Sequence, residues 1–261
     1  MNPSQITRPG FKMIFPDLAA FAAGLGGAWL LGWNTTDLVW SLWLSSLVIG
    51  YLTILSPIAK GVWFGSAVVF SDGFPAQWRA RAILIGLAVA LFVLAFFSIH
   101  FCGFHAVHAG FLSAFFPISG VPRQAFGAAF LNPFLLWKDA FHYLVPKYGV
   151  FLLPVLIAER RTLFGSIGGL IRARRLLDSG RDLGQLLKDS GASAHGLFGR
   201  PYLNVVRMHL LIFFFAICHT LKLDGFPIYL VVYSVYFFPW SAFRKSADDA
   251  PEARREAAQA G

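Results

Sequence analysis

The chain has 261 residues, of which 57% are hydrophobic and 13% charged, and its net charge is +9. Soluble domains carry about 25% charged residues, so this composition excludes a large soluble domain with a charged solvent-facing surface. The positive charge is not accompanied by a nucleic-acid-binding motif, which excludes a nucleic-acid partner. The sequence instead predicts an all-α fold, a polytopic bundle of transmembrane helices.

Apolar segments long enough to cross a bilayer follow one another along the chain. A helix needs about 20 residues to cross the hydrocarbon core. In chain order, the segments cover residues 15–33, 38–59, 82–116, 133–158, 203–221 and 226–243. Asp37 and Lys60 bound the second segment. The sequence therefore predicts about six spans.

The third segment is longer than one span requires. A helix from Ala82 to Phe116 would measure about 52 Å, against a hydrocarbon core of about 30 Å. It either tilts and projects outward or breaks near Gly103 and re-enters. If the fourth segment also splits, at Pro146, the chain would have about eight spans, which is the alternative to six.

Lysine and arginine concentrate in alternate connections, and this pattern predicts the orientation. The basic connections are the N-terminal segment 1–14, the turn after the second span, the loop 159–202 and the tail 244–261. Of these, the loop 159–202 separates spans one to four, within 15–158, from spans five and six, within 203–243. Because basic residues stay on the cytoplasmic side, we predict cytoplasmic termini. In the loop 159–202, leucines interleaved with charged residues predict either amphipathic helices on anionic lipids or a solvated linker.

Histidines inside the predicted spans are the strongest candidate for a functional site. Ionisable groups at membrane depth are costly and usually face the bundle interior. His105 and His108 are three residues apart in the third span, so one ion could bind both. The proposed metal ligands all fall in the outer half of the bundle: His105, His108, His219, His142 and Asp139.

A second group of candidates lies nearer the middle of the bilayer. His100 and His209 could bind a cofactor such as haem, and Arg207 flanks His209. Alternatively, His100 and His209 hydrogen-bond across helices, and Arg207 extends to the cytoplasmic face. The spacing of the histidines does not distinguish a transition metal from haem.

Three short stretches resemble a family of bacterial multipass proteins named domain of unknown function 6498. They are Trp43–Leu52, the histidine string with His100, Gly103, Val107 and His108, and Arg207–His209. Where the family often has an acidic–amide pair, this chain has Ser45 and Ser46, a departure that weighs against a shared polar site there. The resemblance implies a bacterial inner-membrane location and no assigned activity.

Three functions are compatible with these features. The first is a transition-metal or haem protein with a redox role, in which an enzymatic activity is left open and no catalytic residue is identified. The second is a proton-coupled transporter whose histidines titrate near neutral pH. The third is a non-catalytic subunit, in a homo-oligomer or a larger membrane complex.

Overall fold

The computed structural model describes residues 11–71, 73–164, 171, 175, 210, 211, 213–223 and 225–238, and within these ranges the chain is helical with no strand. Three helical runs are long and apolar enough to cross a membrane, namely Thr35–Val69, Ala76–Phe115 and Pro133–Arg160. Two shorter apolar helices, Ile14–Leu30 and Phe226–Val235, fall on the first and sixth predicted segments. The predicted all-α fold with membrane-spanning helices is therefore confirmed.

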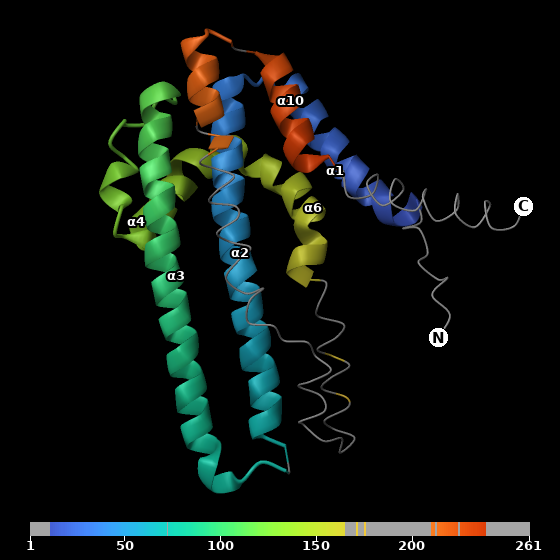
Figure 1. The fold of residues 1–261 in the computed structure, drawn as a ribbon, viewed down its shortest axis with the longest axis vertical. Helices are drawn as coiled ribbons and strands as arrows, with labels where there is room; N and C mark the ends of the chain where they lie inside the picture. Colours follow the sequence, from blue (N-terminus) through green and yellow to red (C-terminus); the bar gives the residue numbers. More distant parts are fainter. Residues whose placement is uncertain are drawn as a thin grey trace, which may run out of the picture.

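The centre of the bundle is a hairpin of two long helices (Figure 1). Helix α2 covers Thr35–Val69, the 3₁₀ turn η1 covers Ala76–Trp78, and α3 covers Arg79–Phe115. Helix α2 begins in a capping box, in which Asn34 and Asp37 accept each other's backbone N–H groups. Such reciprocal bonds satisfy donors that a helix start leaves open, and they fix where α2 begins.

Both helices of the hairpin are longer than one span requires. Helix α3 passes through Gly103 without interruption, so of the two alternatives for the third segment, the break near this glycine does not occur. Helix α2 continues ten residues past Ala59. Lys60 does not end it, because its Nζ donates to the carbonyl of Leu163, 3.1 Å away. This contact gives the cation an acceptor on a neighbouring helix.

The fourth predicted span is one helical run of changing pitch. It comprises α4 (Pro133–Asp139), the π-helix η3 (Ala140–Leu144), α5 (Val145–Tyr148), the 3₁₀ turn η4 (Gly149–Phe151) and α6 (Leu152–Phe164). A proline ring clashes with the carbonyl four residues earlier, which for Pro146 is that of His142. The π-turn widens the helix at that point. The run therefore continues past Pro146, and the split needed for eight spans does not occur there.

Helix α1 (Phe11–Leu30) and helix α10 (Phe226–Phe237) lie together at the side of α6, as Figure 1 shows. Phe21 stacks on Tyr233, with ring centroids 5.2 Å apart. A Cβ on Gly24 would lie 2.0 Å from the Tyr233 hydroxyl, so this glycine permits the close approach of α10. An ion pair between Asp17 and Arg160 joins α1 to α6.

Several predicted segments lie wholly or largely outside the described residues. They are the N-terminal segment 1–14 up to Gly10, most of the basic loop 159–202, the first half of the fifth span, and the tail 244–261. The predictions of amphipathic loop helices and of cytoplasmic termini therefore stay predictions.

Packing between α2 and α3 should tolerate no side chain at Gly50. A Cβ there would lie 2.1 Å from the Phe101 ring, and that ring is confined by Phe97 at 4.7 Å and His105 at 4.2 Å. We expect Gly50→Ala to lower the unfolding free energy by about 1–3 kcal/mol, measured by thermal unfolding in detergent. Gly61→Ala is the matched control in the same helix.

Open space surrounds Gly61, with no atom within 4 Å of an added Cβ. Alanine is favoured over glycine in a helix by about 1 kcal/mol, so this control should be neutral or stabilising. Equal destabilisation by the two substitutions would contradict the proposed close contact at Gly50.

Candidate functional site

His105 lies in the α2–α3 interface and forms hydrogen bonds on both sides of its ring. Its Nδ1 is 3.1 Å from the carbonyl oxygen of Phe101, and its Nε2 is 3.3 Å from the hydroxyl of Ser46 on α2. A carbonyl oxygen only accepts, so Nδ1 carries the proton. In the neutral ring, Nε2 is then the acceptor, and the Ser46 hydroxyl donates to it. His105 thus links α3 to α2.

A set of aromatic rings encloses His105. The Trp43 indole donates through Nε1 to the backbone carbonyl of His105 at 3.0 Å, and its ring lies 5.7 Å from the imidazole. Phe126, from the connection after α3, packs against Trp43 at 5.6 Å. The side chain of His105 is fully buried. These contacts exclude water from the histidine and fix the orientation of its ring.

Among the described residues, His108 is the only other predicted metal ligand that lies beside His105. Its side chain is 2% exposed, and the two imidazole centroids are 6.1 Å apart at an interplanar angle of 55°. The predicted adjacency of these two rings on one helix is therefore present. It follows from the three-residue spacing, which places both rings on the same side of α3.

The other described candidates lie against different neighbours. His100 is exposed and stacks on Phe96 at 5.5 Å. His219 is exposed and packs edge-on against Phe116 at 5.5 Å. His142 is exposed and contacts Tyr143, while Asp139 is half-buried. Arg207 and His209 lie outside the described residues.

Within the described part of the chain, no group of three or more His, Cys, Asp or Glu side chains is arranged to hold a metal ion. The structure thus brings together His105 and His108 from the predicted set. Assigning metal or cofactor binding to any of these residues stays a prediction from the sequence.

Three further polar contacts in the bundle join residues that the sequence analysis did not associate. The Tyr51 hydroxyl is 3.2 Å from the Cys102 sulfur, which joins α2 to α3 one turn from His105. Asp37 accepts a hydrogen bond from the Tyr148 hydroxyl at 3.0 Å and pairs with Lys147, also at 3.0 Å. Asp37 therefore ties the start of α2 to α5.

Only part of this network had a signal in the sequence. The pattern Asn34-x-x-Asp37 is a helix-start signature and could have identified the capping role. The pairing of Ser46 with His105 had no such signal, because the two residues are 59 positions apart.

The chain belongs to a family of unknown function, DUF6498, whose model matches residues 18–235. The match begins within α1 and ends within α10, and so covers all of the described bundle except its two ends. The resemblance to this family, inferred from three short stretches of the sequence, is confirmed. Searches of curated proteins and of solved structures give no match.

The hydrogen bond between Ser46 and His105 can be measured by a double-mutant cycle. We expect Ser46→Ala and His105→Phe to show a coupling free energy of about 0.6 kcal/mol, and at most about 1.7 kcal/mol, as for other interhelical bonds in membranes. The measurement is the unfolding free energy of the single and double variants in detergent.

Ser45→Ala provides the matched control. The Ser45 hydroxyl donates within its own helix, to the carbonyl of Ser41 at 2.7 Å. It should therefore show no coupling with His105→Phe. Equal coupling for Ser45 and Ser46, or none for Ser46, would contradict the assigned bond.

Proposed function

We propose that this protein is a non-catalytic subunit of a membrane assembly, in which the buried histidine of α3 holds two helices together. The observation that supports this proposal best is that both ring nitrogens of His105 are engaged in hydrogen bonds. Nitrogen ligands bind metals through a lone pair. In this tautomer the only lone pair lies on Nε2, where the Ser46 hydroxyl donates.

The length of the exposed apolar surface on α3 supports a protein partner. Exposed large apolar side chains extend from Ile83, 44% exposed, to Phe115, 40% exposed. This stretch is about 48 Å long, and a tilt of 40°, the upper end for membrane helices, reduces it to about 37 Å. The hydrocarbon core is about 30 Å thick. Lipid tails alone leave part of this surface uncovered, and a neighbouring protein would cover it.

A structural role for the histidines predicts a metal-free protein. We expect the protein purified in detergent to contain much less than one transition-metal ion per chain by elemental analysis, and its absorption spectrum to lack a Soret band. His105→Phe should lower thermal stability without changing either measurement. One metal ion per chain, lost in His105→Phe and His108→Ala but kept in Ser45→Ala, would overturn the proposal.

The assembly itself can be tested by photo-crosslinking in native membranes. A photoreactive amino acid at Phe92, which is 69% exposed on α3, should give one protein adduct of defined mass. The same probe at Phe134, at the exposed start of α4, serves as the background control. Adducts with lipid alone at Phe92 would contradict the partner.

A second function, metal binding by His105 and His108, is favoured by the 6.1 Å between their rings. This function requires Ser46 to release Nε2 and further ligands to join the pair. Added Zn²⁺ or Cu²⁺ would then bind with a stoichiometry of one and perturb both imidazole resonances in an NMR spectrum. Proton-coupled transport stays a prediction from the sequence.

A further inference from the structure

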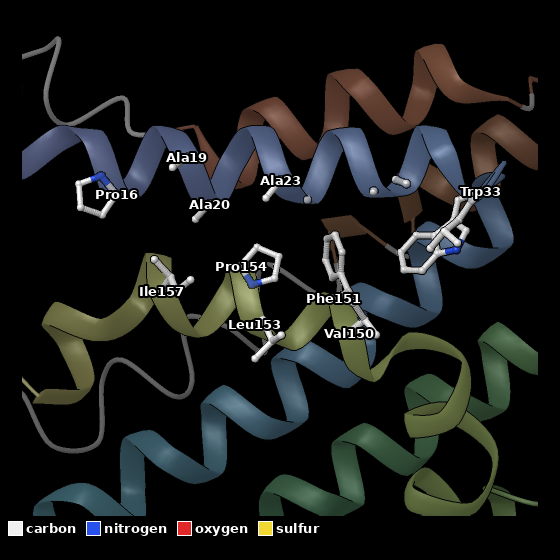
Figure 2. A pocket seen from close by; sticks show the side chains of 14 residues that line it. Pro16, Ala19, Ala20, Ala23, Trp33, Val150, Phe151, Leu153, Pro154 and Ile157 are labelled. Carbon is white, nitrogen blue, oxygen red and sulfur yellow. The ribbon is translucent and has the colours of Figure 1, made fainter.

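A groove of about 520 Å³ lies between α1 and α6 (Figure 2). Its lining is almost wholly apolar. On the α1 side the lining residues are small, such as Ala20, Ala23 and Gly27, and Pro154 and Ile157 lie across from them on α6. Several lining side chains are more than half exposed, among them Val150 and Leu153. The groove is therefore open to the surroundings of the bundle.

The two ends of the groove differ in chemistry. At one end, Pro16 and Ile157 lie beside the ion pair between Asp17 and Arg160, and the Arg160 Nη1 also donates to the carbonyl of Ile157. At the other end stands Trp33, which packs edge-on against Tyr148 at 5.5 Å. Tryptophan is favoured at membrane–water interfaces. Along α1 the groove extends from Pro16 to Leu31, about 22 Å.

The volume of the groove indicates which kind of molecule it binds. A cavity of about 150 Å³ binds benzene, so 520 Å³ has room for on the order of 20 carbon atoms, or one acyl chain. A helix about 10 Å wide would occupy roughly 1,700 Å³ over the same length, more than three times the volume of the groove. A hydrocarbon chain therefore fits inside the groove, whereas a helix from a second copy is too wide to enter it.

The charge at the Arg160 end of the groove indicates which lipid head group binds there. The Arg160 side chain keeps 28% of its surface exposed beside its pair with Asp17. In the sequence, this end of the two helices carries three basic residues, Lys12, Arg160 and Arg161, and two acidic residues, Asp17 and Glu159, for a net charge of +1. Arginine is well suited to bind phosphate oxygens.

We propose that the groove between α1 and α6 binds one acyl chain of an anionic phospholipid, whose phosphate lies at Arg160. The chain occupies the space between Ala20, Ala23 and Gly27 on α1 and Pro154 and Ile157 on α6. This inference is independent of the proposed assembly role, because the groove and the exposed surface of α3 belong to different helices.

Photo-labelling in vesicles tests the acyl chain. The full-length protein is placed in phosphatidylcholine vesicles containing phosphatidylglycerol with a photoreactive acyl chain, and the labelled peptides are mapped by mass spectrometry. We expect labelling of α1 and α6 in the native protein and a fall to background in Gly27→Phe, whose side chain would fill the groove. Gly26→Phe is the matched control.

Both glycines have open space around an added Cβ, but only Gly27 lines the groove. Gly26→Phe should therefore leave labelling unchanged, and thermal unfolding verifies that both variants fold. Unchanged labelling in Gly27→Phe, or an equal loss in both variants, would overturn the proposal. It would also be overturned if light scattering showed a dimer that Gly27→Phe dissociates.

The head group is tested by two variants that remove the same ion pair. Arg160→Gln removes the cation and should lower phosphatidylglycerol labelling about fivefold, as expected for one basic residue at a membrane surface. Asp17→Asn keeps the cation and should not lower labelling. An equal fall in both variants would show that the ion pair has only a structural role, and would overturn the assignment of the phosphate to Arg160.

Discussion

The contact between α2 and α3 around His105 is the constraint on which the rest of the bundle depends. In a lipid environment, apolar side chains gain little by leaving the tails, so helices associate through close packing and side-chain hydrogen bonds. The hairpin uses both. Gly50 allows the Phe101 ring to approach the α2 backbone, and His105 bonds to Ser46 across the interface. Two indoles of α2 add bonds to backbone carbonyls of α3 and of the residue after it.

The remaining helices are attached to this hairpin by charged contacts near their ends. Lys147 and Tyr148 bind the Asp37 carboxylate at the start of α2, and Lys60 binds the carbonyl of Leu163 in α6. Helix α1 in turn is joined to α6 through Asp17 and Arg160. Because these contacts lie near the helix ends, the middle of the α1–α6 interface is not held closed, and the groove is found there.

Two interfaces of the bundle, α2–α3 and α1–α6, differ in how their side chains pack. In the α2–α3 interface, hydrogen bonds pair Trp43, Ser46 and His105, and the His105 ring is enclosed, which is expected of a region that specifies the fold. In the α1–α6 interface, small side chains of α1 face the larger side chains of Pro154 and Ile157 on α6 across open space. Small residues in membrane helices commonly permit close helix contact, and here part of that small-residue surface faces the groove instead of a helix.

The apolar segments and the two adjacent histidines could be read from the sequence, because both depend on local order. Long apolar runs predict helices wherever they occur, and a three-residue spacing places His105 and His108 on one side of α3. The capping of α2 by Asn34 and Asp37 is local in the same sense. The change of helical pitch before Pro146 follows from the missing N–H and the ring of this one residue. Its form, a π-turn, could not be read from the sequence.

What only the tertiary structure decided concerns residues far apart in the chain. On the neighbouring helices, His105 contacts Ser46 and not His219, and Asp37 pairs with Lys147. Helical periodicity fixes which face of a helix a residue occupies, but the rotation of each helix about its own axis depends on how all the helices pack together. Whether a buried histidine meets a hydroxyl or another histidine is settled by that rotation, and the same is true of the space left between α1 and α6.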